Sequence, residues 1–291
     1  MTTAYSEKPI VSVIIATYNR AKTLPRAIDS ALNQSYGNIE IMVIDDGSTD
    51  ATEEVVRSYS KNPKVRYMYQ ENKNCHVDTR NNGIKATQGK YLAILDDDDF
   101  WCDVKKIEKQ VDFLENNKEY VLVGGGAIKI DHEGNEIVRY LLPEKDADIR
   151  EKILISNSFA HVTVLFKKEA WETLGGYDPH FDGMEDWNLW MRMGTIGKFH
   201  NIQEFFVRYT GHQRGNLGYV EKKYSKQEWL KLNIKLKKKF KGQYPHYAKA
   251  LLFCWLGYFY SLLPFRRQLW PAIFKIRSAL FKETPWKYKK K

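Results

Sequence analysis

The sequence predicts an α/β fold, with a mostly parallel sheet flanked by helices in a Rossmann-like arrangement. Two observations lead to this prediction. Short apolar runs alternate with helical patterns through the first 116 residues, an order typical of parallel strands joined by crossover helices. Clusters of polar residues then follow three of the expected strands, and open α/β sheets bind their ligands at the carboxyl ends of strands.

The expected elements follow from these patterns in chain order. Apolar runs indicate buried strands, and apolar residues at helical spacing between polar ones indicate helices. The expected strands lie at 11–17, 39–46, 65–70 and 90–95, and the helices between and after them at 24–34, 52–59, 78–86 and 104–116. The middle of the chain, about 120–208, is mixed, with a hairpin expected around 131–135. Further helices are expected from about 222 to 240, at 247–263 and at 268–281.

Length and charge divide the chain into a body and a tail. The 291 residues, 43% of them hydrophobic, are enough for one full domain with an appendage. We expect this domain to span residues 1–220, in halves of about 9–118 and 119–220, and a helical basic region to follow over 221–291. That region carries 19 basic residues against three acidic ones, whereas the first 220 residues carry 27 basic and 33 acidic. Basic tails bind nucleic acids or anionic membrane surfaces.

One apolar stretch within the basic tail bears on membrane binding. Residues 250–263 are apolar but number only 14, fewer than the about 20 needed to span a bilayer. Lys249 precedes the stretch and Arg266 and Arg267 follow it, a pattern typical of a helix lying in the membrane interface. The alternative is a helix packed on the rest of the protein with its lysines in water, and the sequence leaves both open.

The cysteines and the N-terminus predict a cytoplasmic location. The three cysteines, Cys75, Cys102 and Cys254, lie far apart and form no metal-binding spacing, and an odd number argues against a disulfide framework. A reducing compartment is therefore expected. The first eleven residues lack the charged and then apolar pattern of a signal peptide.

Four consecutive aspartates, Asp96, Asp97, Asp98 and Asp99, are the strongest functional signal. They directly follow an apolar strand, where neighbouring carboxylates repel one another and water screens them poorly. A bound cation relieves this repulsion, and oxygen ligands favour Mg²⁺ or Mn²⁺ over zinc. The alternative is that these aspartates cap the following helix. Capping would use one or two of them, so the tetrad favours a metal site.

Two other acidic segments have both a structural and a functional interpretation. In the segment from Asp45 to Asp50, Asp-Gly is typical of a turn and the polar residues of a helix cap, whereas the functional interpretation has one of its aspartates accept a hydrogen bond from a nucleobase. Glu185 and Asp186 precede an aromatic helix, where acidic residues are common. The functional interpretation makes one of them a general base toward a sugar hydroxyl.

Two basic or titratable side chains are further candidates. His212 is a candidate ligand for the metal or a phosphate, although a lone histidine is more often structural. Arg80, in the segment Thr79-Arg80-Asn81, is a candidate partner for a phosphate. Its alternative role is a solvated charge on a helix.

Together these segments resemble the family 2 glycosyltransferases of GT-A fold. The resemblance lies in VSVIIATYNR, IEIMVIDDGSTD, TRNNGI, GKYLAILDDDDFW and GMEDWNLWMR, which occur in the family's order and cover about residues 9–215. Each motif alone is moderately specific, and the ordered set is highly specific. The resemblance implies a GT-A-type sheet, with a nucleotide-binding half over 9–118 and an acceptor half over 119–220.

The resemblance also implies roles for the donor-binding residues. Thr17, Tyr18 and Asp46 are expected to hold the nucleotide, and Arg80 to lie near the base or the diphosphate. UDP is the expected nucleotide. The donor's diphosphate is expected to bind together with a divalent metal, Mn²⁺ or Mg²⁺.

The acidic motifs receive roles in the same way. Asp96 and Asp98 resemble the family's D-x-D pair: Asp98 is expected to bind the metal, and Asp96 the donor's ribose or the metal. Asp97 is also expected to contact substrate. It occupies the middle position of this D-x-D pattern, where members of the family often have a small residue. Asp186 matches the position of the catalytic base, and Glu185 that of a residue orienting donor or acceptor hydroxyls.

His212 is expected to be a metal ligand because the family often has a histidine after a Tyr-Arg pair. The spacing here, Arg208-Tyr209-Thr210-Gly211-His212, departs from that pattern.

The resemblance implies a metal-dependent, inverting hexosyltransferase. Asp186 would take the proton of an acceptor hydroxyl while that oxygen displaces the nucleoside diphosphate in one step. The acceptor would be a saccharide or a lipid-linked sugar in cell-surface polysaccharide or glycolipid synthesis, at the inner face of the membrane, with residues 221–291 contacting anionic lipid. Trp101, Trp187 and Trp190 are candidates for stacking on sugars, although tryptophan more often packs in a core.

Three other functions were weighed. A sugar nucleotidyltransferase also combines a parallel sheet with Mg²⁺, but it carries a Gly-rich basic loop after its first strand, where this chain has Thr17-Tyr18-Asn19-Arg20. A nucleic-acid-binding protein would use the basic tail, but the body is acidic and nucleic-acid-binding motifs are absent from the sequence, so we expect no nucleic acid partner. A catalytically inactive nucleotide-sugar-binding domain is disfavoured by the intact acidic residues.

Overall fold

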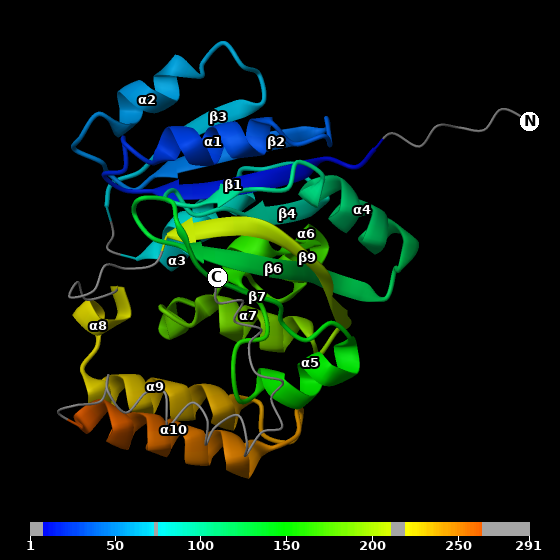
Figure 1. The fold of residues 1–291 in the computed structure, drawn as a ribbon, viewed down its shortest axis with the longest axis vertical. Coiled ribbons are helices and arrows are strands. Elements are labelled where there is room, and N and C mark those ends of the chain that lie inside the picture. The colour runs from blue at the N-terminus through cyan, green and yellow to red at the C-terminus, as the bar shows by residue number, and fades with distance from the viewer. Residues whose placement is uncertain (1–7, 73–74, 211–218, 264–291) are drawn as a thin grey trace, which may run out of the picture.

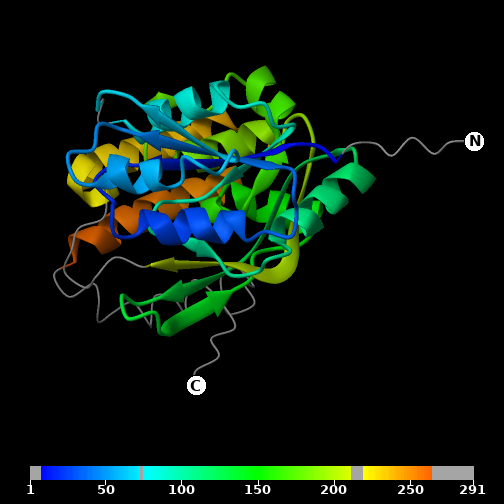
Figure 2. The same cartoon turned by 90° about the horizontal axis from the view of Figure 1, so that it is seen from above.

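The fold is a curled central sheet with helices on both faces (Figures 1 and 2). It is described here from a computed structural model, in which residues 8–72, 75–210 and 219–263 are placed. The α/β fold class with a mostly parallel sheet is confirmed. The pair α9 and α10 lies side by side at the edge of the molecule farthest from α2 (Figure 1).

Nine strands form one sheet, whose main path runs β3-β2-β1-β4-β8-β6-β9-β5, with β7 paired to β6. Strands β1, β2, β3, β4, β6 and β9 run in one direction, and β5, β7 and β8 in the other. The strands are β1 (Val11–Thr17), β2 (Ile39–Asp45), β3 (Val65–Tyr69), β4 (Tyr91–Ile94), β5 (Phe100–Trp101), β6 (Tyr120–Ile130), β7 (Glu136–Tyr140), β8 (Leu165–Lys167) and β9 (Lys198–Thr210).

The helices connect these strands and cover the sheet. In chain order they are α1 (Leu24–Leu32), α2 (Thr52–Ser58), α3 (His76–Lys85), α4 (Lys106–Asn116), α5 (Asp146–Ile153), α6 (Lys168–Thr173), α7 (Glu185–Met193), α8 (Tyr219–Lys223), α9 (Lys226–Lys239) and α10 (Tyr247–Leu262). Short 3₁₀ turns occur at His161–Thr163 and Pro179–Phe181.

The sheet is buried on both faces because successive residues of its central strands point to opposite sides. In β1, Val13 and Ile15 join a core with α1 and α4, while Ile14 joins a second core with α3 and α7. The second core also includes Leu236 and Phe240, from α9 and its C-terminal end. The first part of the basic tail therefore packs on the rest of the protein.

Most of the expected elements are confirmed, with ends that differ by one or two residues. The four strands and four helices of the first 116 residues are present, as is the hairpin, which joins β6 to β7. In the tail, α10 matches the helix expected at 247–263. The helix expected from about 222 to 240 is present as α9 but begins four residues later, at Lys226, because the separate helix α8 ends at Lys223. The helix expected at 268–281 lies outside the described residues. No helix among the described residues is long and apolar enough to cross a membrane. The division at residue 220 stays a prediction.

Candidate active site

The predicted meeting of polar residues at one edge of the sheet is confirmed. Strands β2, β1 and β4 are neighbours and run parallel, with Thr17 opposite Asp45 at their carboxyl ends. Thr17 ends β1 and Tyr18 and Asn19 follow it, Asp46 follows β2, and the aspartate tetrad follows β4. These three segments therefore surround one site.

The segment after β2 serves both as a turn and as part of the site. Asp45 accepts hydrogen bonds from the backbone N–H of Ser48 (2.8 Å) and the hydroxyl of Tyr67 (2.8 Å), which hold the turn. Asp50 accepts from the N–H of Thr52 (3.0 Å), in the first turn of α2. The buried carboxylate of Asp46 is not used in these bonds and instead accepts from the side-chain amide of Gln70 (2.6 Å). The turn and the site thus use different aspartates.

The other two predicted nucleotide-binding residues differ in exposure. Thr17 is buried, whereas the side chain of Tyr18 is 43% exposed beside it. Asn19 has a positive φ of 53°, and its side-chain oxygen accepts from the N–H groups of Thr49 (2.7 Å) and Asp50 (3.2 Å). These two hydrogen bonds tie the end of β1 to the loop after β2. Tyr18 therefore lies on a segment whose position is fixed by the neighbouring loop.

The aspartate tetrad does not cap the following helix. Helix α4 begins at Lys106, and the carboxylate near its start is Asp103, which accepts from the N–H of Lys105 (2.8 Å). Asp99 is buried and instead accepts from the N–H of Thr210 (3.0 Å), at the end of β9. The capping alternative is therefore wrong for the tetrad.

The tetrad concentrates negative charge. Burial and repulsion from Asp98 raise the pKa of Asp97 to about 7, although the Thr17 hydroxyl and Arg20 act in the opposite direction. Burial and repulsion from Asp96 and Asp98 raise the pKa of Asp99 to about 9.

Asp96 and Asp98 are the members of the tetrad most open to solvent, with side chains 38% and 36% exposed. Arg20 lies 3.5 Å from Asp97 and 3.8 Å from Asp98. Among the described residues, no group of three or more acidic, His or Cys side chains is arranged to hold a metal ion. His212 lies outside the described residues.

Arg80 joins the two acidic motifs. Its guanidinium lies 3.2 Å from Asp96 and 2.7 Å from Glu185, and its side chain is only 13% exposed. Burial opposes its charge, but the two carboxylates raise its pKa. Arg80 is therefore not the solvated helix charge of the alternative interpretation. Its partner Glu185 lies 105 positions after it in the sequence.

Asp186 has the environment of a general base. Burial and repulsion from Glu185 raise its pKa to about 7, while the N–H of Trp187, the amide of Asn157 and Arg80 oppose this. Its Oδ1 accepts from the N–H of Trp187 (2.6 Å) and its Oδ2 from Nδ2 of Asn157 (2.7 Å). Glu185 is fixed by Arg80 and by the N–H of Gly183 (2.7 Å). A carboxylate whose pKa lies near neutrality can both hold and release a proton there.

Sequence reasoning missed three residues of this site. Asn157 bonds Asp186, and the ring of His161 lies 3.0 Å from the hydroxyl of Tyr177. Burial and Arg80 lower the pKa of His161 to about 3, so the ring is neutral. All three come from the mixed middle of the chain, where no periodic pattern or motif marked them.

Two of the three candidate sugar-stacking tryptophans are core residues. Trp101 is 4% exposed and Trp190 is not exposed at all, so that expectation is wrong for both. Trp187 is half-buried, donates from its indole to the carbonyl of Ile153 (2.6 Å) and has the ammonium of Lys237 3.1 Å from its ring centre.

Comparisons with known proteins agree with this geometry. The model of the family described as Glycosyl transferase family 2 matches residues 12–174. An uncharacterized glycosyltransferase of Methanocaldococcus jannaschii, MJ1057, is 30% identical over 263 residues, covering 88% of each chain. An uncharacterized glycosyltransferase of Rickettsia conorii, RC0461, is 35% identical over 213 residues. This match covers 70% of the present chain but spans only 34% of that relative's length.

Solved structures share the fold. Staphylococcus aureus TarS 1-349, in complex with UDP-GlcNAc, superposes with a TM-score of 0.66 at 17% identity, covering 87% of this chain and 73% of that one. The mannosyltransferase PcManGT of Pyrobaculum calidifontis, in complex with GDP-Man and Mn²⁺, gives a TM-score of 0.63 at 18% identity, covering 94% and 76%. The expected GT-A fold is therefore confirmed.

Proposed function

The chain belongs to glycosyl transferase family 2, and we propose that it is an inverting hexosyltransferase that moves a sugar from a nucleotide-diphosphate donor to an acceptor hydroxyl. The observation that carries this proposal is the contact of Arg80 with both Asp96 and Glu185. It joins the donor side of the site to the carboxylate pair that contains Asp186.

The donor is proposed to lie over the carboxyl ends of β1, β2 and β4. Thr17, Tyr18 and Asp46 border one end of this edge, and we assign them to the nucleoside, with UDP as the expected nucleotide. The complexes of TarS with UDP-GlcNAc and of PcManGT with GDP-Man support a nucleotide-sugar donor. Arg80 is assigned to the diphosphate side, where it also fixes Glu185.

Asp96 and Asp98 are proposed to hold Mn²⁺ or Mg²⁺ together with the donor's diphosphate, with Asp97 beside the donor. The ligating side chains fit such an ion. The carboxylates of Asp96 and Asp98 are partly open to solvent, and the negative charge of the tetrad already raises the pKa of Asp97 and Asp99. One or two carboxylates plus substrate phosphates is a common arrangement for Mg²⁺. When bound, the ion would neutralise charge on the leaving diphosphate. The mannosyltransferase complex with Mn²⁺ supports the assignment, and His212 is proposed as a further ligand.

Asp186 is proposed to be the general base. Its Oδ1 and Oδ2 are each held by one donor from the protein, so the carboxylate keeps one orientation. It would take the proton of the acceptor hydroxyl as that oxygen bonds to the anomeric carbon and the bond to the nucleoside diphosphate breaks. A single displacement of this kind inverts the anomeric carbon. Glu185 would orient hydroxyls of the donor or the acceptor.

The acceptor is proposed to be a saccharide or a lipid-linked sugar in cell-surface polysaccharide or glycolipid synthesis, at the cytoplasmic face of the membrane. Residues 9–118 would form the nucleotide-binding half and 119–220 the acceptor half. Residues 221–291 would contact anionic lipid. Two features support this last assignment: the 19 basic residues of that region and the exposed apolar residues of α10.

A donor panel tests the proposal. Full-length protein is incubated with nucleotide sugars and Mn²⁺, with water as the only acceptor hydroxyl, and the nucleoside diphosphate released by donor hydrolysis is measured for the parent chain, Asp186→Asn, Asp98→Ala and the hairpin control Asp131→Asn. We expect Asp186→Asn to lower turnover by about 10²–10⁴-fold, the range for a general base. Asp98→Ala should raise the Mn²⁺ concentration needed, and the control should match the parent.

Three results would count against the proposal. Undiminished turnover in Asp186→Asn would overturn the base assignment. Pyrophosphate release from a nucleoside triphosphate and a sugar phosphate would identify a nucleotidyltransferase. Salt-dependent DNA binding with no turnover of any nucleotide sugar would identify a nucleic-acid-binding protein.

A further inference from the structure

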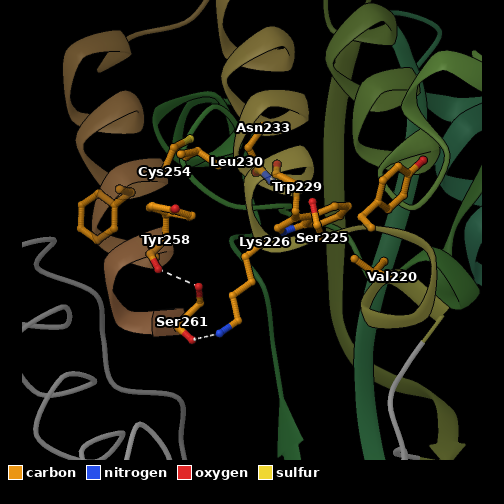
Figure 3. A pocket seen from close by; sticks show the side chains of 12 residues that line it. Val220, Ser225, Lys226, Trp229, Leu230, Asn233, Cys254, Tyr258 and Ser261 are labelled. Carbon is orange, nitrogen blue, oxygen red and sulfur yellow. Dashed lines mark hydrogen bonds between the residues drawn. The ribbon is translucent and has the colours of Figure 1, made fainter. Parts of the chain in front are cut away.

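A groove of about 430 Å³ lies between α9 and α10. Its walls are largely apolar: Trp229 and Leu230 come from α9, and Phe253, Cys254 and Tyr258 from α10. Figure 3 shows the labelled side chains of the two helices around it, with Lys226 of α9 reaching toward α10 at one end. The Nζ of Lys226 donates there to the carbonyl of Ser261 (2.6 Å).

The groove adjoins the loop that leads into α7, whose first turn carries the proposed general base. Gly183, three positions before Asp186, packs so closely that a Cβ on it would lie 3.0 Å from Val220 and 3.4 Å from Trp229, both of which line the groove. A third lining residue, Tyr224, donates from its hydroxyl to the carbonyl of Asp182 (2.9 Å). A molecule in the groove would therefore lie directly behind the loop that leads into α7 and Asp186.

The end of the groove near this loop is basic. Lys222, Lys223 and Lys226 are exposed along α8 and the start of α9. Lys223 pairs with Asp182, the acidic residue of the loop before α7 that lies nearest to this lysine. The ion pair neutralises the charge of Asp182. An apolar channel with a cationic end is complementary to an amphiphile with an apolar chain and an anionic head.

We propose that the groove between α9 and α10 binds the apolar chain of an anionic, phosphate-linked lipid acceptor. This inference rests on the proposed function, since it places the acceptor's sugar toward Asp186. The apolar chain of the lipid lies in the groove itself, and the exposed outer face of α10 takes no part in binding it.

Gly257 provides a selective way to fill the groove. It lines the groove from α10, and a Cβ on it would meet nothing within 4 Å. Leucine is also a better helix former than glycine, so Gly257→Leu should fold normally while occupying the space. Gly37→Leu is the matched control, because Gly37 is exposed, has ordinary backbone angles and also has nothing within 4 Å of a built Cβ.

The test uses dodecyl phosphate below its micelle concentration, with butyl phosphate and inorganic phosphate as short-chain comparisons. Binding to the full chain is measured by titration calorimetry. We expect saturable 1:1 binding of dodecyl phosphate at least about 100-fold tighter than butyl phosphate, because each buried methylene adds favourable transfer free energy. Gly257→Leu should weaken this binding at least about tenfold, and Gly37→Leu should leave it unchanged. Unfolding midpoints in urea verify that both variants are folded.

Equal binding by the parent and Gly257→Leu would overturn the proposal, as would an absence of saturable binding. If a second copy of this protein occupied the groove, dodecyl phosphate would show no saturable binding, and sedimentation would reveal a dimer that depends on protein concentration. Failure of the proposed function is seen separately, because donor turnover is measured without any lipid. An active enzyme that does not bind the alkyl chain would refute only the present inference.

Discussion

The carboxylate of Asp186 is held by one donor from the next residue and by one that only tertiary structure brings to it. Asn157, 29 positions earlier, donates to Oδ2 at 2.7 Å, and the N–H of Trp187 donates to Oδ1. Both bonds favour the ionised form, whereas burial and Glu185 favour the protonated form. The balance leaves a pKa of about 7, so small changes around Asp186 should be visible near neutral pH.

Replacing Asn157 by leucine should move the pH profile of the reaction. The parent's kcat/KM is expected to rise with pH through about 7 as Asp186 ionises. Loss of a hydrogen bond to the charged form costs about 1.5–3 kcal/mol, so in Asn157→Leu the rise should move about one to two pH units higher. Initial rates from pH 5 to 9 check this. Asn117→Leu is the control, because it removes a similar hydrogen bond, from the side-chain amide of Asn117 to the carbonyl of Phe113 at the end of α4.

The pH dependence of folding gives a readout without substrate. Because the pKa of Asp186 is raised, the folded chain holds a proton between pH 4 and 7 that the unfolded chain has lost. The free energy of unfolding should therefore fall as pH rises through this window. Asp186→Asn should flatten that slope, and an unchanged slope would contradict the environment described for Asp186.

At the scale of elements, α9 is fastened to α7 through a buried amine. Lys237 is 1% exposed and its Nζ lies 3.1 Å from the ring centre of Trp187, the residue after Asp186. Among the described residues the ammonium has no hydrogen-bond partner. Burial lowers its pKa to about 7, against a small opposing effect of Cys254. The basic tail thus reaches the helix that carries Asp186, the proposed base.

Lys237→Met should stabilise the protein. Methionine keeps the unbranched shape and the contact with Trp187 but removes a buried, unbonded polar group, which costs about 1–3 kcal/mol in proteins. We expect the free energy of unfolding at pH 7 to rise by about that amount. Urea denaturation measures it, and the exposed neighbour variant Lys238→Met should change it by less than about 0.5 kcal/mol.

Lys237→Met should also change how the free energy of unfolding depends on pH, in a direction set by the lowered pKa of Lys237. Between pH 7 and about 10 the unfolded chain binds the Lys237 proton and the folded chain does not. Stability due to this residue should therefore increase with pH across that window. A Lys237→Met chain that keeps the full slope would show that Lys237 is solvated rather than buried.

For the whole molecule, α10 presents two apolar sides. One side packs toward α9, and the other exposes large apolar residues spaced three or four positions apart: Leu252, Trp255, Leu256, Phe259 and Leu262, each 46–57% exposed. A helix that is apolar all round is normally buried or in contact with lipid. The packing alternative is therefore confirmed for the side of α10 that faces α9. The interfacial alternative stays a prediction, which the exposed apolar side supports.

The outer face of α10 should bind membranes. The double variant Trp255→Ser/Phe259→Ser is expected to lower cosedimentation with anionic vesicles about tenfold or more, because it removes two large apolar side chains from the interface. Binding by the parent should fall with added salt, since the lysines of the tail attract anionic lipid. Ile137→Ser/Leu141→Ser removes exposed apolar residues from the other part of the molecule and is the control. Equal vesicle binding by both double variants would contradict the role of α10.

The sequence by itself determined strands β1 to β4 and the edge of the sheet at which we propose that the donor binds. Local patterns were sufficient for β1 to β4 and their helices, because a buried parallel strand needs an unbroken apolar run and its ligand-binding residues follow at once. The motifs around Asp46, Asp96 and Asp186 were found for the same reason: each is continuous in sequence.

Only the tertiary structure decided how these motifs meet. The partners of Arg80, the bond from Asn157 to Asp186, the burial of Trp101 and Trp190, and the groove beside Gly183 all join residues distant along the chain. Strand β9 likewise pairs with both β6 and β5 through contacts that no local pattern encodes. Such contacts depend on how the two faces of the sheet are filled, and periodicity within a single segment carries no record of its distant neighbours.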